Sequence, residues 1–440
     1  MNPERVIRIG ILGFGTVGQG VYKNLQQCGQ ALAWRVGARL EVTRASVSSL
    51  AKPRSVDTPD GFLTSDSWSI VDDPEIDLVC ELIGGTTVAR DLTLAAFAAG
   101  KCVITANKAL ICEHGAQLFA AAREHGVHYF FEASVAGGIP IIKTLREGLV
   151  ANRFPRIYGI LNGTSNYILT RMEREGKTFA DILDDARALG YVEADEGLDL
   201  DGWDAAHKAV VLGYLAHGRW VTYPEMVVQG IRRFTQLDFQ AASEFGFKIK
   251  VLAVIERDFS ENALSIFVRP HMLPREHPMA RVDGVFNGIS LLGDVVGETF
   301  LVGRGAGPDP TSSAVISDLA DAAFELQGAP PPPISEENVD VYAELARGLK
   351  MQPLDSQPGS FYLRLKVRDQ PGVLADLARV LADHQVSIAR LHQRDEPVGH
   401  TADLILTTHQ TTEGGIRAAA KALETMPAVI EEPFVVRLFV

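Results

Sequence analysis

Three glycines near the N-terminus constrain the fold of this chain more than any other feature. A β-rich run over residues 5–12 ends in a short turn, and a helical segment follows at once. The turn reads Gly13-Phe14-Gly15-Thr16-Val17-Gly18. In such a G-x-G-x-x-G turn the first glycine permits the sharp bend, the second lets a pyrophosphate approach the backbone, and the third allows close helix–strand packing. The six residues are therefore predicted to bind a dinucleotide, with its phosphates over the helix N-terminus.

The alternation of short β-rich runs with helical segments continues to about residue 150. The expected strands are residues 5–12, 41–47, 77–83, 101–105 and 127–132. Each is mostly apolar, as a strand covered on both faces must be. This pattern is typical of a parallel sheet with helices on its faces. The predicted fold class is α/β, and residues 1–150 are expected to form a Rossmann-like, doubly wound dinucleotide-binding domain.

The remaining residues are predicted to form two further domains. Residues 151–328 are expected to be a mixed α/β domain with a helix over 203–217, while 306–328 return to the first domain. Four prolines at 330–333 begin a linker over residues 329–358, because proline disrupts both helix and sheet. Residues 359–440 show the order βαββαβ, which predicts a ferredoxin-like domain. Its strands are expected at 361–367, 386–393, 401–408 and 434–440.

Composition excludes several classes of protein. The formal net charge of −13 would repel a phosphate backbone, so nucleic acid is not an expected partner. The four cysteines show no C-x-x-C spacing and the histidines show no H-E-x-x-H pattern, so neither disulfides nor a catalytic metal are predicted. No apolar run reaches the roughly 18 residues of a membrane helix, and the chain begins without a leader. A cytoplasmic protein without a membrane partner is expected.

The end of the second expected strand bears on which dinucleotide binds. An enzyme that uses NAD usually carries Asp or Glu there, but residues 45–54 contain no carboxylate. Ser48, Lys52 and Arg54 offer a hydroxyl and two cations to a 2′-phosphate, which favours NADP, with NAD as the alternative cofactor. An equally weighted interpretation is that the two cations are solvated loop residues.

Two lysines are candidates for chemistry. Lys108 follows Asn107 at the carboxyl edge of the predicted sheet, where open α/β sheets bind ligands, although an ordinary surface lysine is equally weighted. Asp204 and Lys208 are four residues apart on the expected helix 203–217 and share one face, so the carboxylate can hold the ammonium group. The alternative is an ordinary surface pair, with Asp201 as the helix cap.

Seven segments make the chain resemble the homoserine dehydrogenase family along nearly its whole length. They read GILGFGTVGQGV, ELIGG, TANKALI, EASVAGGIPIIKTLREGL, GILNGTSNYILTRM, LGYVEADEGLDLDGWDAAHKAVVL and GRGAGPDPTSSAVISDL. The resemblance implies reversible NAD(P)-dependent oxidation of L-homoserine to L-aspartate 4-semialdehyde, in the biosynthesis of threonine, methionine and isoleucine. It also implies a homodimer or homotetramer, with residues 151–328 serving substrate binding, catalysis and dimerisation.

The same resemblance implies roles for individual residues. Lys208 and Lys108 would be catalytic, and Glu193, Asp204 and Asp199 would bind the substrate. The residues implied to contact the cofactor are the six of the glycine turn, Ser48, Lys52, Arg54, Gly84, Gly85, Asn107, Lys108, Gly190 and Gly305. The backbone at Glu132, Val135, Gly137 and Ile139 is implied to bind a structural sodium ion, where the residues alone indicate a simple strand–helix turn. Many relatives have an arginine in place of Ser48, which weakens the preference for NADP.

The C-terminal βαββαβ segment resembles an ACT domain, a module that binds amino acids at a dimer interface. The resemblance rests on the turn Asp369-Gln370-Pro371-Gly372-Val373-Leu374 after the first strand. It implies feedback control with threonine as the effector, and the alternative is a domain that only assembles subunits. Two other functions stay open: the same chemistry on another small amino or hydroxy acid, and a nucleotide-sensing regulator without turnover. The set of Lys108, Glu193, Asp204 and Lys208 argues against the regulator.

Overall fold

The computed structural model describes residues 5–190, 196–328, 346–395 and 400–439, which divide into two compact units. The first unit comprises 1–155, 207–222 and 287–349, and the second comprises 156–206, 223–286 and 350–440. Both units therefore combine segments that lie far apart in the sequence. Helix α9 (Trp203–His217), which ends where the sequence predicts, begins in the second unit and continues into the first.

The first unit contains a parallel sheet in the strand order β3-β2-β1-β4-β5-β6. The strands are β1 (Val6–Leu12), β2 (Arg39–Ser46), β3 (Leu63–Thr64), β4 (Leu78–Glu81), β5 (Cys102–Thr105) and β6 (Tyr129–Phe130). Every residue of β4 and β5 is buried, because helices cover both faces of the sheet. From β1 the chain first adds β2 and β3 on one side, and then returns to add β4, β5 and β6 on the other side. The strand order therefore reverses between β1 and β4, and open α/β sheets bind ligands at such a switch point. The predicted Rossmann-like fold is confirmed.

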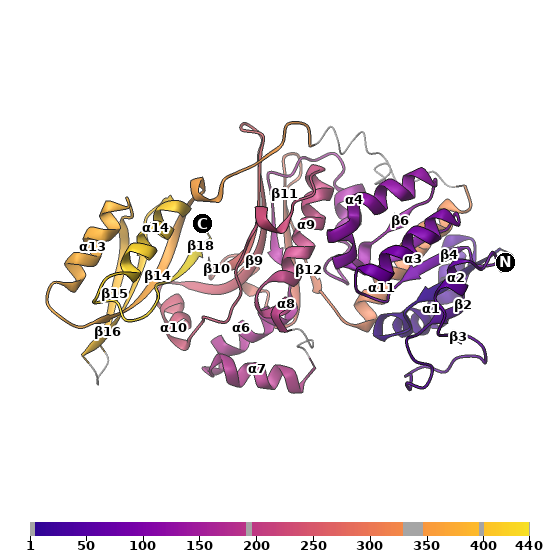
Figure 1. The fold of residues 1–440 in the computed structure, drawn as a ribbon, viewed down its shortest axis with the longest axis horizontal. Helices are drawn as coiled ribbons and strands as arrows, with labels where there is room; N and C mark the ends of the chain where they lie inside the picture. Colours follow the sequence, from indigo (N-terminus) through magenta and orange to yellow (C-terminus); the bar gives the residue numbers. More distant parts are fainter. Residues whose placement is uncertain (1–4, 191–195, 329–345, 396–399, 440) are drawn as a thin grey trace. The chain divides into compact units, whose positions relative to one another are not determined.

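Helices α1 (Thr16–Val36) and α11 (Pro308–Glu325) lie side by side in this unit (Figure 1). A side chain at Gly20 would meet the carbonyl oxygen of Pro308 at 3.0 Å, and the amide of Asn24 donates to the hydroxyl of Ser312 at 2.6 Å. The other elements of the unit are α2 (Trp68–Val71), α3 (Thr87–Ala98), α4 (Lys108–Glu124), α5 (Ile141–Lys143), most of β11 (Phe286–Gly293), and β12 (Gly297–Arg304).

The second unit contains a mixed sheet in the order β7-β9-β10-β18-β14-β16-β15. Its long hairpin joins β9 (Phe247–Asp258) to β10 (Ala263–Pro274), with β7 (Arg156–Ile160) antiparallel to β9. Almost all residues of β10 are buried, so the hairpin lacks the alternation that marks a half-exposed strand, and the sequence did not resolve it. The helices beside this sheet are α6 (Gly163–Glu175), α7 (Phe179–Ala188), α8 (Glu196–Leu200) and α10 (Gln236–Glu244).

The C-terminal part of the second unit confirms the predicted βαββαβ order. Its elements are β14 (Pro358–Arg368), α13 (Val373–Asp383), β15 (Ile388–Asp395), β16 (Thr401–Thr408), α14 (Glu413–Glu424) and β18 (Phe434–Leu438). Alternate residues of β14, such as Leu363 and Leu365, form one core with Leu381 of α13 and Leu423 of α14. Strand β18 also pairs in parallel with β10, so the sheet of this domain continues the β9–β10 sheet.

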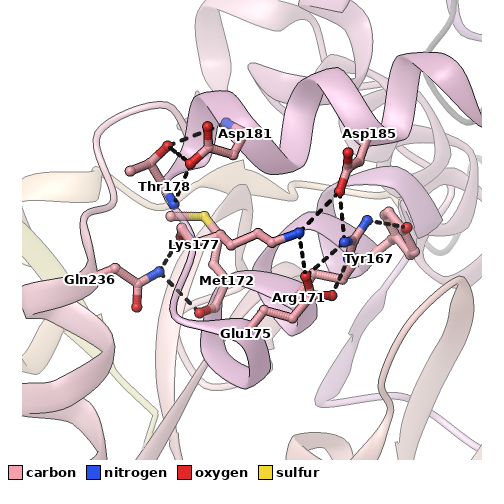
Figure 2. Close-up of polar contacts among 9 residues, drawn as sticks. All are labelled: Tyr167, Arg171, Met172, Glu175, Lys177, Thr178, Asp181, Asp185 and Gln236. Carbon is pink, nitrogen blue, oxygen red and sulfur yellow. Dashed lines mark hydrogen bonds and ion pairs between the residues drawn. The ribbon is translucent and has the colours of Figure 1, made fainter.

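A polar cluster joins α6 to α7 (Figure 2). The Arg171 guanidinium donates to Glu175 at 2.7 Å, to Asp185 at 2.8 Å and to the hydroxyl of Tyr167 at 2.9 Å. The hydrogen bond from Arg171 lowers the pKa of Glu175 to about 2. Helix α7 then begins with a capping box between Thr178 and Asp181, so the α6–α7 corner is fixed by both helices.

Candidate functional site

The glycine turn after β1 has the geometry that dinucleotide binding requires. Gly13 adopts a φ of 96°, and a Cβ there would lie 2.6 Å from the backbone of Leu82. A Cβ at Gly18 would lie 2.4 Å from the carbonyl oxygen of Gly13, whereas a Cβ at Gly15 would meet no atom within 4 Å. Gly13 and Gly18 are therefore required by the protein's own packing, and Gly15 leaves open space beside the backbone.

The start of α1 fits an anionic group. Gly15 is the N-cap, so no side chain caps the helix, and its first turn, which begins Thr16-Val17, contains no acidic residue. Phe14 is buried, and its ring packs edge-on against the ring of Phe62. Because backbone N–H groups at a helix start carry partial positive charge, this end of α1 suits a phosphate.

The loop after β2 carries the residues expected to select the cofactor. Arg54 donates to the carbonyl oxygens of Ser49 at 2.6 Å and Leu50 at 3.2 Å, so its guanidinium holds its own loop. Ser48 and Lys52 are exposed on the same loop. The loop is joined to α1 because Gln19 accepts a hydrogen bond from the Ser55 amide at 2.7 Å.

A polar cluster lies at the carboxyl ends of β4 and β5. The carboxylate of Glu81 is fully buried and accepts from the hydroxyl of Thr105 at 2.7 Å. Burial raises the pKa of Glu81. Asn107 caps α4 through Leu110 and donates to the carbonyl oxygen of Gly85 at 2.7 Å. The sequence prediction missed Glu81, although an acidic residue inside an apolar strand was a visible signal.

The glycine pair after this cluster and Lys108 lie at the same edge of the sheet. Gly84 and Gly85 both have positive φ, 75° and 72°. Lys108 is the first residue of α4, and two residues separate it from the end of β5 at Thr105. The structure therefore brings Gly84, Gly85, Asn107 and Lys108 to the carboxyl edge of the sheet that also carries the glycine turn.

The segment from Glu132 to Ile139 lies outside any long helix or strand. A 3-10 turn covers Glu132–Ser134, and Ala136 and Gly137 both have positive φ. The side chain of Glu132 accepts from the amides of Ile142 at 2.9 Å and Lys143 at 2.8 Å, and burial raises its pKa to about 7. Both side-chain oxygens of Glu132 thus accept hydrogen bonds from the protein's own amides. The atoms of Glu132 to consider as a cation ligand are therefore those of its backbone carbonyl group.

Gly305 lies against the same segment. A Cβ at Gly137 would meet the carbonyl oxygen of Gly305 at 2.7 Å, and a Cβ at Gly305 would meet the side chain of Asn287 at 2.1 Å. The amide of Gly138 donates to the carbonyl oxygen of Arg304 at 2.9 Å. The structure therefore brings Gly305 and the segment with Val135, Gly137 and Ile139 together.

The residues expected to bind and convert the substrate lie around α8 and α9. Asp199 is buried in α8, Asp204 is in the first turn of α9, and Lys208 is a buried residue one turn later on α9. Gly190 lies two residues after the end of α7 and has a φ of 71°. Glu193 lies outside the described residues.

The structure adds one residue that the sequence prediction missed. The side-chain amide of Asn162, at the start of α6, donates to Asp199 at 2.7 Å and to Asp204 at 2.9 Å. Asn162 occurs within the segment GILNGTSNYILTRM, but its contacts join residues about 40 positions away, so no local pattern indicates them.

The glycine turn, the switch point and the polar edge of the sheet define an α/β protein of the dinucleotide-binding class, with a C-terminal βαββαβ domain. Comparisons with known proteins specify the family. Residues 140–320 match the homoserine dehydrogenase family, residues 13–132 match the homoserine dehydrogenase NAD-binding domain, and residues 361–428 match the ACT domain. The chain belongs to the homoserine dehydrogenase family.

Individual relatives agree with this assignment over the full length. A homoserine dehydrogenase from Pseudomonas aeruginosa is 40% identical over 427 residues, which cover 96% of each chain. A crystal structure of a homoserine dehydrogenase from Thiobacillus denitrificans matches with a TM-score of 0.91 and 40% identity, covering 99% of this chain and 98% of that one. A hyperthermophilic archaeal homoserine dehydrogenase in complex with NADPH matches with a TM-score of 0.60 and 25% identity, covering 74% of this chain and 99% of that one.

Two features are absent from the described residues. No helix there has the length and apolar character needed to cross a membrane. Within the same residues, no group of three or more His, Cys, Asp or Glu side chains could hold a metal ion.

Proposed function

We propose that the chain oxidises L-homoserine reversibly to L-aspartate 4-semialdehyde, in the biosynthesis of threonine, methionine and isoleucine. The observation that carries the proposal is the pair of carboxylates, Asp199 of α8 and Asp204 of α9, which one amide holds together. Asp204 lies one helical turn before Lys208 on α9. Two carboxylates suit the ammonium group of an amino acid, and a lysine suits the transfer of the hydroxyl proton.

A nicotinamide cofactor held by the glycine turn and the start of α1 would supply the hydride acceptor for the proposed reaction. Asp199 and Asp204, with Glu193, bind the ammonium group and so orient the substrate. Lys208 takes the proton of the substrate hydroxyl during oxidation and returns it during reduction, and Lys108 donates a hydrogen bond to the same oxygen. Oxidation therefore releases one hydride and one proton from the alcohol, to two different acceptors.

The test is an initial-rate assay of the purified protein with L-homoserine and either NAD or NADP, followed through the reduced cofactor. Turnover with L-homoserine, and much slower turnover with other small hydroxy or amino acids, is expected. Turnover of a different small amino or hydroxy acid in place of L-homoserine would support the alternative in which the same chemistry acts on another substrate. Cofactor binding without reduction of any substrate would support the regulator.

We propose NADP as the preferred cofactor, with NAD as the second. Two features of the chain after β2 support this preference: residues 45–54 contain no carboxylate, and Lys52 is an exposed cation. The variant Lys52→Glu is expected to raise the KM for NADP more than the KM for NAD, since it places a negative charge near the 2′-phosphate.

A structural sodium ion is proposed at the backbone carbonyl oxygens of Glu132, Val135, Gly137 and Ile139. Carbonyl oxygens are suitable ligands for a hard cation, and the positive φ values of Ala136 and Gly137 take these residues out of regular secondary structure. Bound sodium would fix this segment, which packs against Gly305.

We further assign residues 1–150, with 306–328, to cofactor binding, 151–328 to substrate binding and dimerisation, 329–358 to the linker and 359–440 to regulation.

Threonine is the proposed effector, and a homodimer or homotetramer is the proposed assembly. Strand β12 supports the assembly, because it exposes Val302 and Phe300, and the turn before it exposes Val295 and Val296. The cysteines form no disulfide within the described residues, which supports a cytoplasmic location.

A further inference from the structure

We propose that Asn162 is a positioning residue that orients Asp199 and Asp204 toward the ammonium group of the substrate. The inference rests on the proposed function and deepens it. Asp199 and Asp204 come from two different helices, so a third group must keep them in one arrangement when the substrate is absent.

The amide of Asn162 contacts both carboxylates at once. Its Nδ2 atom lies 2.7 Å from Oδ1 of Asp199 and 2.9 Å from Oδ2 of Asp204. A side-chain amide nitrogen carries two protons, so each carboxylate receives one of them. Asn162 is 6% exposed and Asp199 is 7% exposed, so water cannot readily replace these hydrogen bonds.

The orientation of the amide is fixed from its other end. The Oδ1 atom of Asn162 accepts from the backbone N–H of Ser165 at 2.7 Å, as the N-cap of α6. The reversed amide would point its oxygen at two carboxylates and its nitrogen at an N–H group. Only one orientation therefore satisfies the three neighbours, and the helix cap and the carboxylate bridge depend on the same side chain.

Helix α6 gives this amide a rigid base. Asn166, one turn further on, donates to the carbonyl oxygens of Val282 at 3.0 Å and Phe286 at 3.1 Å. The buried Lys250 donates to Oδ1 of Asn166 at 3.0 Å. The C-terminal end of α6 is fixed by the Arg171 cluster (Figure 2).

A neutral side chain with two donors is the suitable chemistry at this position. A lysine or arginine would also bridge the carboxylates, but its charge would compete with the substrate ammonium group. An aspartate would cap α6 equally well, yet it would add a third negative charge and donate nothing. Asn162 brings the carboxylates together and leaves their negative charge for the substrate.

The test separates capping from positioning. Asn162→Asp keeps an acceptor for the Ser165 amide and loses both donors to the carboxylates. We expect the KM for L-homoserine to rise by about tenfold or more, while the KM for the cofactor stays within about twofold. The acid limb of the kcat/KM profile should also move to higher pH, because lost donors and an added carboxyl favour protonated carboxylates.

Two variants keep the result interpretable. Asn162→Ser also caps a helix without reaching both carboxylates, so it replaces Asn162→Asp if that variant does not fold, with the same expected rise in KM. Thr178→Ala removes the cap of α7 and should lower the urea midpoint without changing the KM for L-homoserine.

A wild-type KM and pH profile in the folded Asn162 variants would overturn the inference, while turnover of L-homoserine by the wild-type protein would leave the proposed function intact. An equal rise in KM in Thr178→Ala would also overturn it, by tracing the effect to helix stability. A wild-type protein that does not oxidise L-homoserine would overturn both.

Discussion

The hydroxyl group of Tyr362 donates a hydrogen bond of 2.8 Å to the carboxylate of Asp238, and both side chains are buried. Arg364 donates to the same oxygen at 2.9 Å, and the backbone amide of Thr235 donates to the other oxygen at 2.8 Å. Burial raises the pKa of Tyr362, so this hydroxyl remains a donor. One carboxylate thus joins α10 to the first strand of the ACT domain.

Removing this carboxylate is expected to destabilise the protein strongly. Asp238→Ala leaves the Tyr362 hydroxyl buried without its acceptor and removes the ion pair of the partly buried Arg364, which should lower the free energy of unfolding by about 3–5 kcal/mol. Urea unfolding monitored by circular dichroism measures the change. The exposed ion pair of Asp355 and Arg417, 2.9 Å apart, is the matched control. Asp355→Ala should cost less than about 1 kcal/mol, and equal losses would contradict the importance of burial.

The glycine turn permits a second prediction, in which two similar substitutions have different effects. Gly15→Ala meets no atom within 4 Å, so the free energy of unfolding should change by less than about 1 kcal/mol. Its methyl group would occupy the space into which a pyrophosphate approaches, so the Kd for the cofactor should rise at least about tenfold. Fluorescence titration with the reduced cofactor measures this.

Gly18→Ala is the counterpart. Its Cβ would lie 2.4 Å from the carbonyl oxygen of Gly13, so the helix must move away from the strand, at a cost of about 1–3 kcal/mol. Unchanged cofactor affinity in a folded Gly15→Ala protein would show that the phosphates bind elsewhere.

A third prediction concerns the acid stability of the second unit. His271 is 1% exposed, and its Nδ1 atom lies 2.9 Å from the carbonyl oxygen of Arg269. Burial, followed by the positive charges of Arg269 and Arg437, lowers the pKa of His271 well below its ordinary value. Below a pH of about 6.5 the unfolded chain therefore binds a proton at His271 that the folded chain excludes. Above that pH both states are neutral at His271 and the group does not affect stability, whereas below it the proton bound only by the unfolded chain lowers the free energy of unfolding as the pH falls.

Unfolding by urea at several pH values tests this expectation. Between pH 6.5 and the lowered pKa, His271 should contribute a slope of about 1 kcal/mol per pH unit. His271→Asn retains a donor for the Arg269 carbonyl and does not titrate, so its stability should fall less steeply with acid. The exposed His409 provides the control variant, His409→Asn. Identical slopes for wild type and His271→Asn would contradict the prediction.

The sequence predicted those elements whose pattern is local. The strand before Gly13, the helix that begins at Trp203 and the βαββαβ order after residue 358 each carry their own periodicity or turn residues. By contrast, the pairing of β18 with β10 joins residues such as Arg437 and His271, which are far apart in the chain. Strand pairing of this kind depends on tertiary packing and leaves no spacing signal.

The candidate site shows the same division. The glycine turn could be predicted because each glycine has a separate steric reason within six residues. Asn162 could not, because its role depends on Asp199 and Asp204 folding back to it from α8 and α9. Glu81 lies between these cases, since its residue type was visible and its partner Thr105 was not.

The most direct test of the account is the rate of L-homoserine oxidation by Lys208→Ala, with Lys421→Ala on the exposed side of α14 as control. If Lys208 transfers the substrate proton, kcat should fall by about 10²–10⁴-fold in Lys208→Ala, and cofactor affinity and the unfolding midpoint should stay close to wild type. Lys421→Ala should retain full activity. A folded Lys208→Ala protein that oxidises L-homoserine at the wild-type rate would contradict the account.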